Sequence, residues 1–84
     1  MAFVPIELED YVEKHVVRNP GSRRSEVRER LQAALRDFQA RVKCRCGNPI
    51  WVIGSAVVGR ACFTCITGEA VPDHDYEIAE ACIQ

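Results

Sequence analysis

The chain has 84 residues, of which 48% are hydrophobic and 27% charged, and its formal net charge is −1. This length is expected to form one domain with a modest core. No apolar run approaches the roughly 20 residues that span a bilayer, so we expect no membrane-spanning helix.

The small net charge conceals an uneven distribution. Residues 1–17 carry −3, residues 18–60 carry +7 and residues 61–84 carry −5. A basic middle of this kind raises nucleic-acid binding as a hypothesis. The acidic ends are expected to fold back onto it.

The first residues do not resemble a secretory signal. Glu7, Glu9 and Asp10 follow almost at once after a short apolar start, whereas a signal peptide has a basic start and a longer apolar run. We therefore predict a cytoplasmic protein whose thiols stay reduced.

The first expected element is a helix from Pro5 to about Arg18. Proline suits the first helical position, and acidic residues crowd the first turns, where the helix dipole favours them. His15 falls in the apolar stripe of this helix. We interpret it as a packed histidine, with a metal ligand or switch as the alternative. The stripe has helical spacing and comprises Val4, Leu8, Tyr11, Val12 and Val16.

A second, longer helix is predicted after the break at residues 19–22, which read Asn-Pro-Gly-Ser. A cap at Ser22 or Ser25 begins it, and it ends near Val42. The two helices are predicted to form an antiparallel helical hairpin over residues 1–42. A second copy could complete the core of this hairpin as a homodimer. The apolar stripe of the second helix comprises Val27, Leu31, Ala34, Leu35, Phe38 and Val42.

Arginines are frequent in and around the second helix, and contact with nucleic acid is one interpretation of them. On a helical wheel they do not gather on one face. Arginine stems beside an apolar stripe more often cover the edge of the core and keep their charged heads in water. We therefore favour a solvated face over phosphate contact. The residues concerned are Arg23, Arg24, Arg28, Arg30, Arg36 and Arg41.

Four of the five cysteines form two short pairs, Cys44/Cys46 and Cys62/Cys65. Two such pairs from separate parts of a chain are the usual ligands of a tetrahedral structural zinc site. Side chains at i and i+2 of an extended segment point to one side, so both thiolates of the first pair can face one ion. Gly47 follows directly, where a small residue lets the backbone turn around sulfur. We predict one structural Zn²⁺ bound by all four cysteines.

The fifteen residues between the pairs, 47–61, predict a β-hairpin. Two β-prone runs, 50–53 and 56–58, are separated by Gly54-Ser55. Two cysteine knuckles joined by a hairpin resemble a zinc ribbon over residues 43–69. Zinc ribbons bind nucleic acid, bind protein or simply stabilise a fold, so the resemblance does not choose among these functions.

Two alternatives to zinc use the same four cysteines. Two disulfides would suit an exported protein, which the absence of a signal-like start argues against. A rubredoxin-like iron site would use the same four thiolates, although the tight Cys44-x-Cys46 spacing argues mildly against it.

The helical hairpin and the ribbon are expected to form one rigid unit, because the second helix runs almost directly into Cys44. Trp51 is interpreted as the packing contact between the two parts, given its apolar neighbours. An exposed platform on which a base stacks is the alternative.

Residues 70–84 form the expected acidic C-terminal segment. Asp73 could cap a short last helix. A cation site at Asp73-His74-Asp75 is a weaker alternative. Cys82 is interpreted as a spare thiol. The segment is expected to contact the core through Tyr76, Ile78 and Ile83 and to leave Asp75, Glu77 and Glu80 exposed.

These patterns predict an α+β fold with no catalytic activity. An N-terminal antiparallel helical hairpin packs on a small β-hairpin zinc ribbon, and a short helix or extended segment follows. Four cysteines close the zinc coordination, whereas a catalytic zinc keeps an open position. We predict a protein–protein interaction or adaptor module with no membrane and no small-molecule substrate. The alternative is a nucleic-acid-binding ribbon that uses residues 18–60.

Overall fold

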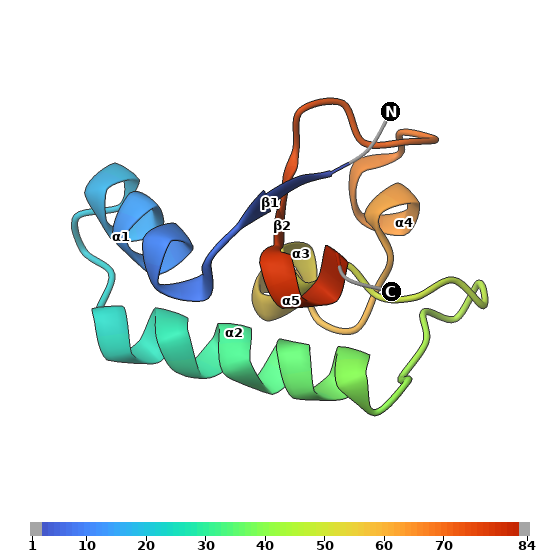
Figure 1. Ribbon diagram of the computed structural model, residues 1–84, viewed down its shortest axis with the longest axis horizontal. Coiled ribbons are helices and arrows are strands. Elements are labelled where there is room, and N and C mark those ends of the chain that lie inside the picture. Colours follow the sequence, from blue (N-terminus) through green and yellow to red (C-terminus); the bar gives the residue numbers. More distant parts are fainter. Residues whose placement is uncertain (1–2, 83–84) are drawn as a thin grey trace.

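The computed structural model describes residues 3–82, and these form a mixed fold of helices and two short strands. Helix α2 extends along one side of the molecule, and α3 and α5 lie between it and the strands (Figure 1). In chain order the elements are β1 Val4–Ile6, α1 Leu8–Arg18, α2 Arg24–Gln39, α3 Val52–Val58, α4 Phe63–Thr67, β2 Tyr76–Ile78 and α5 Ala79–Cys82.

The two strands come from opposite ends of the described chain and pair in parallel. Val4 lies opposite Tyr76, and Ile6 lies opposite Ile78. The Val4 N–H donates to the Asp75 carbonyl at 2.8 Å. The sheet therefore joins the two ends of the described chain. Its strands are parallel, whereas the strands of a hairpin are antiparallel.

This pairing corrects two of the three predicted helix starts. Pro5 lies in β1 rather than at the start of a helix, and α1 begins at Leu8. Proline lacks an N–H group, which a short two-stranded sheet tolerates because each strand has a free edge. At the other end Asp73 caps no helix, since the chain first forms β2 and α5 begins only at Ala79.

One hydrophobic core draws on the N-terminal helices, the segment between the cysteine pairs and the C-terminal segment. The largest side chains below 2% exposure are Leu31, Ile78, Val12 and Val52. Ile78 is therefore a core residue, as predicted, while Ile83 lies outside the described residues. The core is completed by Val27, Ala34, Leu35, Ile53 and Ala81.

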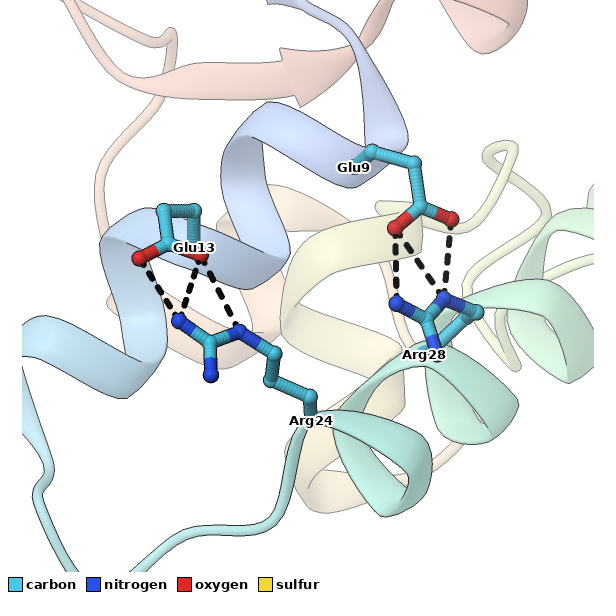
Figure 2. A network of polar contacts seen from close by, with 4 residues as sticks. All are labelled: Glu9, Glu13, Arg24 and Arg28. Carbon is cyan, nitrogen blue, oxygen red and sulfur yellow. Dashed lines mark hydrogen bonds and ion pairs between the residues drawn. The ribbon is translucent and has the colours of Figure 1, made fainter.

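Two ion pairs join α1 to α2 (Figure 2). The Arg28 Nε lies 2.9 Å from a Glu9 oxygen, and the Arg24 Nη2 lies 2.7 Å from a Glu13 oxygen. The earlier residue of α1, Glu9, pairs with the later arginine of α2, and Glu13 pairs with the earlier one. The paired turns of α1 and α2 therefore run in opposite directions. Exposed pairs such as these are screened by solvent and contribute little to stability. They confirm that the acidic N-terminal segment folds onto the basic middle.

Helix α2 is shorter than predicted. It begins at Arg24 without a side-chain cap, so the predicted serine cap is wrong, and it ends at Gln39 instead of near Val42. The end is closed by a hydrogen bond of 2.9 Å from the Val42 N–H to the Asp37 carbonyl. Arg41 makes this turn with a φ of 66°, a left-handed conformation that glycine adopts with less strain.

Arg41→Gly is expected to raise the free energy of unfolding by about 1 kcal/mol, because it removes the strain of a left-handed non-glycine residue. Urea unfolding at fixed metal saturation measures this. Arg36→Gly is the matched control, since it makes the same change inside α2 and should cost about 1 kcal/mol. Equal destabilisation by both variants would contradict the strain at Arg41.

The predicted β-hairpin between the cysteine pairs is wrong, because residues 52–58 form helix α3. β-Propensity depends on tertiary context, and this run is largely buried between α2 and β2. Gly54 was expected to make a turn. It instead lies inside the helix, where a Cβ would collide with the Trp51 ring and the Ile66 side chain.

Candidate metal centre

The four paired cysteines converge on one point. Their Sγ atoms all lie within 4.8 Å of one another. The Cys44–Cys65 sulfurs are 3.5 Å apart, and the Cys46–Cys62 sulfurs are 3.4 Å apart. Each close contact therefore joins one member of the first pair to one member of the second.

The first pair lies in a tight loop after α2. The Cys44 N–H donates to the Asn48 carbonyl at 2.9 Å, and the Gly47 N–H donates to the Cys44 carbonyl at 2.8 Å. Gly47 has a φ of 93°, so its lack of a side chain permits the turn. The Asn48 side-chain amide donates to the Cys46 sulfur at 3.4 Å. This loop turns both sulfurs toward the second pair.

The second pair lies at the start of α4. Cys62 is the N-cap residue, and its sulfur accepts the Cys65 N–H at 3.4 Å. Cys65 lies within the helix itself. The five-residue helix ends at Gly68, which has a φ of 82°. A short helix capped by one ligand and carrying the other presents both sulfurs on one side.

Helix α3 positions this second pair. The Ser55 hydroxyl donates to the Ala61 carbonyl at 2.9 Å and accepts the Ala61 N–H at 3.1 Å. Arg60 forms an ion pair of 2.9 Å with Asp37 of α2. The two residues that precede Cys62 are thus held by α3 and α2, and this fixes the position of the Cys62 sulfur.

Burial and hydrogen bonding divide the four thiols into two kinds. Cys44 and Cys62 are each 4% exposed, whereas Cys46 and Cys65 are exposed. Hydrogen bonds from the backbone N–H groups of Cys46 and Cys62 lower the pKa of Cys44 to about 6. The hydrogen bond that links Cys65 to Cys44 raises the pKa of Cys65 to about 12. Without a cation, a thiolate at Cys44 therefore opposes ionisation of Cys65.

A metal ion would remove that opposition. Metal ligation requires deprotonated thiols, and a divalent ion offsets the repulsion among four thiolates. A tetrahedral zinc with bonds of about 2.3 Å places its sulfurs roughly 3.8 Å apart. The observed sulfur separations bracket that spacing. The four cysteines therefore fit a tetrahedral metal site. None of the five cysteines, all of which lie in the described part of the chain, forms a disulfide in this structure.

The other sequence candidates lie apart from this cluster. Within residues 3–82 the four cysteines are the one close group of three or more potential ligands. His15 is half-buried in α1 beside the Tyr11 ring. His74 is exposed and lies 3.4 Å from an Asp73 oxygen. Cys82 lies in α5, and its thiol contacts the Glu77 carbonyl at 3.9 Å.

Glu77 is the residue that sequence reasoning missed, because it was expected to be exposed. It is 3% exposed in β2. Its carboxylate accepts the Val52 N–H at 2.8 Å, the Ile53 N–H at 3.3 Å and the Ile78 N–H at 2.9 Å. Burial raises the pKa of Glu77 to about 7, although these hydrogen bonds oppose the shift. Its place between Tyr76 and Ile78 gave no signal of burial, because alternation along a strand puts Glu77 on the opposite face from these two residues.

Trp51 is a packing residue, as predicted, and not an exposed platform. It is half-buried against the core, and its indole N–H donates to the Tyr76 carbonyl at 2.9 Å. Its ring contacts Phe63 edge-on, with centroids 5.0 Å apart. Trp51 thereby connects the core with the helix that carries Cys65.

No protein-family model matches the chain, and no curated protein or solved structure shows significant similarity to it. No helix within residues 3–82 is both long and apolar enough to cross a membrane.

Proposed function

We propose that the chain is a small zinc-binding module whose four-cysteine centre is structural and whose function is to bind another protein. The observation that carries the proposal is the convergence of all four sulfurs within 4.8 Å. Zinc is the metal best suited to four thiolates in a reduced compartment, and such closed sites stabilise folds rather than catalyse reactions.

The structural role follows from what the centre connects. The backbone hydrogen bonds of the first-pair loop are local, from Cys44 to Asn48 and from Gly47 to Cys44, and α4 has five residues. Neither segment is long enough to fold independently. A shared ion would hold the loop and α4 together and anchor both beside α3.

A protein partner is supported by apolar surface near the end of α3. Val57 is 70% exposed and Val58 is 63% exposed. Adjacent valines at such exposure offer apolar area to a partner. The acidic surface of the C-terminal segment adds charge for recognition, with Asp73 and Glu80 exposed and Glu69 exposed just before the segment.

Nucleic acid is the second candidate partner. Arg41, Lys43 and Arg45 are exposed where α2 leads into the first cysteine pair, and phosphate groups would fit such cations. However, Arg24, Arg28 and Arg60 already bind carboxylates of this chain. Fewer basic groups are therefore free than the sequence indicates.

A native mass spectrum of the protein, purified from its own host without chelators, tests the proposal. We expect one added zinc ion, and we expect a chelator to remove the fold with the metal, as circular dichroism would show. An iron mass would replace the proposal with electron transfer. A metal-free mass four hydrogens short would indicate two disulfides. A co-purified protein supports the first partner class, and co-purified nucleic acid supports the second.

A further inference from the structure

A cavity of about 360 Å³ lies between the metal centre and β2. Cavities that bind small ligands or side chains usually begin near 300 Å³. Its lining includes aromatic side chains, Cys62 of the metal centre and the buried Glu77. The cavity is therefore large enough for a guest and directly adjoins the candidate centre.

Three rings form one aromatic wall of this cavity. Phe3 stacks on Trp51 with centroids 5.9 Å apart, and it meets Phe63 edge-on at 5.5 Å. Trp51 and Phe63 also contact each other. Because Phe3 stacks on Trp51, one face of each of these two rings is covered by the other, and with Phe63 they form one continuous wall rather than a cage. The faces of aromatic rings attract cations within about 6 Å.

The charges around the cavity have one sign. With a divalent ion bound, four thiolates would leave a net charge of −2 at the centre to which Cys62 belongs, and Glu77 would add negative charge in its ionised form. None of the described residues that line the cavity is Lys, Arg or His. A positive guest would therefore meet complementary charge, whereas a phosphate or carboxylate would be repelled.

The hydrogen bonds that Glu77 already makes restrict further which positively charged groups fit the cavity. Its two oxygens already accept three backbone N–H groups. An ammonium group with three N–H donors would lose hydration without gaining the full set of acceptors. A methylated ammonium has fewer or no N–H donors to satisfy, and it suits an aromatic wall.

We propose that this cavity binds a methylated ammonium group, such as a trimethylated lysine side chain of a partner protein, against the wall of Phe3, Trp51 and Phe63. The inference rests on the proposed zinc centre, which supplies part of the negative charge. It assigns a ligand class to the protein-binding function.

Choline and 3,3-dimethylbutan-1-ol form a matched pair of probes, because they differ only in whether the trimethyl-bearing atom is a charged nitrogen or a neutral carbon. Trp51 is the one tryptophan in the sequence, so its fluorescence reports directly on this cavity. With the zinc-loaded protein we expect choline to change the fluorescence and to bind about tenfold more tightly than its neutral isostere. An amide of trimethyllysine is expected to bind at least as tightly as choline.

Phe3→Leu keeps apolar bulk but removes one ring of the wall, and it is expected to weaken choline binding several-fold. Tyr11→Leu is the control, because Tyr11 lies on α1 and does not line the cavity. Equal binding of choline and its isostere would overturn the proposal, as would an unchanged fluorescence up to about 100 mM choline, far above any specific affinity. Metal content measured on the same sample separates the two proposals: a folded, zinc-loaded protein that ignores choline overturns this inference alone, whereas a metal-free protein overturns both.

Discussion

Cys62→Ser is expected to weaken metal binding by several orders of magnitude and to abolish the cooperative unfolding transition of the metal-loaded protein. Apparent binding free energies of structural zinc are roughly 10–16 kcal/mol, and they are realised as folding free energy when the unfolded chain lacks the site. Cys62 is buried, caps α4 and contacts the Cys46 sulfur. A serine hydroxyl can still accept the N–H at the start of α4, so the substitution removes the metal ligand while a helix cap remains possible.

Cys82→Ser is the matched control for this prediction. It makes the same change at a partly buried thiol that lies outside the four-cysteine cluster. We expect it to retain one zinc per chain and a cooperative transition. Zinc content by mass spectrometry and guanidinium unfolding measure both variants. A Cys62→Ser protein that keeps wild-type zinc affinity and unfolds at the same denaturant concentration would contradict a structural role for the centre.

The second large effect is expected at Glu77, whose pKa is raised by burial from 4.5 to about 7. Between these values the folded protein binds more protons than the unfolded chain. The stability contributed by this group is therefore greatest at acidic pH and falls as pH rises toward 7. With 1.36 kcal/mol for each pKa unit, the fall amounts to about 2–3 kcal/mol between pH 5 and pH 8.

Glu77→Gln isolates this effect, because glutamine does not titrate and both proteins contain the same metal centre. The difference in free energy of unfolding, wild type minus variant, should decrease by that amount from pH 5 to pH 8 when both are zinc-saturated. Glu80→Gln on α5 is the control, because it makes the same substitution at an exposed position. A flat difference for Glu77→Gln would show that the carboxyl group does not titrate in this range.

The cysteine spacing was the most informative part of the sequence. Short pairs carry their geometry locally, so Cys44/Cys46 and Cys62/Cys65 could be recognised as one cluster before the fold was known. The long helices α1 and α2 were also predictable in position, since each has a sustained apolar stripe. Their ends were less predictable, because a strand pairing at Pro5 and a left-handed turn at Arg41 are not visible in helical periodicity.

The predicted β-hairpin between the two cysteine pairs was wrong for a different reason. Its β-branched residues favour strands, and Gly54-Ser55 resembles a turn. The N–H groups of Val52 and Ile53 at the start of α3 are satisfied by Glu77, which lies 24–25 residues away in the chain. No local pattern can report such a distant hydrogen-bond partner, and the same distance concealed the burial of Glu77.

The pairing of β1 with β2 also bears on how the molecule acquires its fold during synthesis. β1 leaves the ribosome before β2 and meets this partner strand only after nearly all the described residues have followed. The same late segment delivers the carboxylate that caps α3. Closing so long a loop is entropically costly and slow compared with forming the helices. The nascent chain would thus pass through a stage in which α1 and α2 have formed but β1 has not yet paired with β2. At this stage the cysteines would be accessible to metal before the final packing is complete.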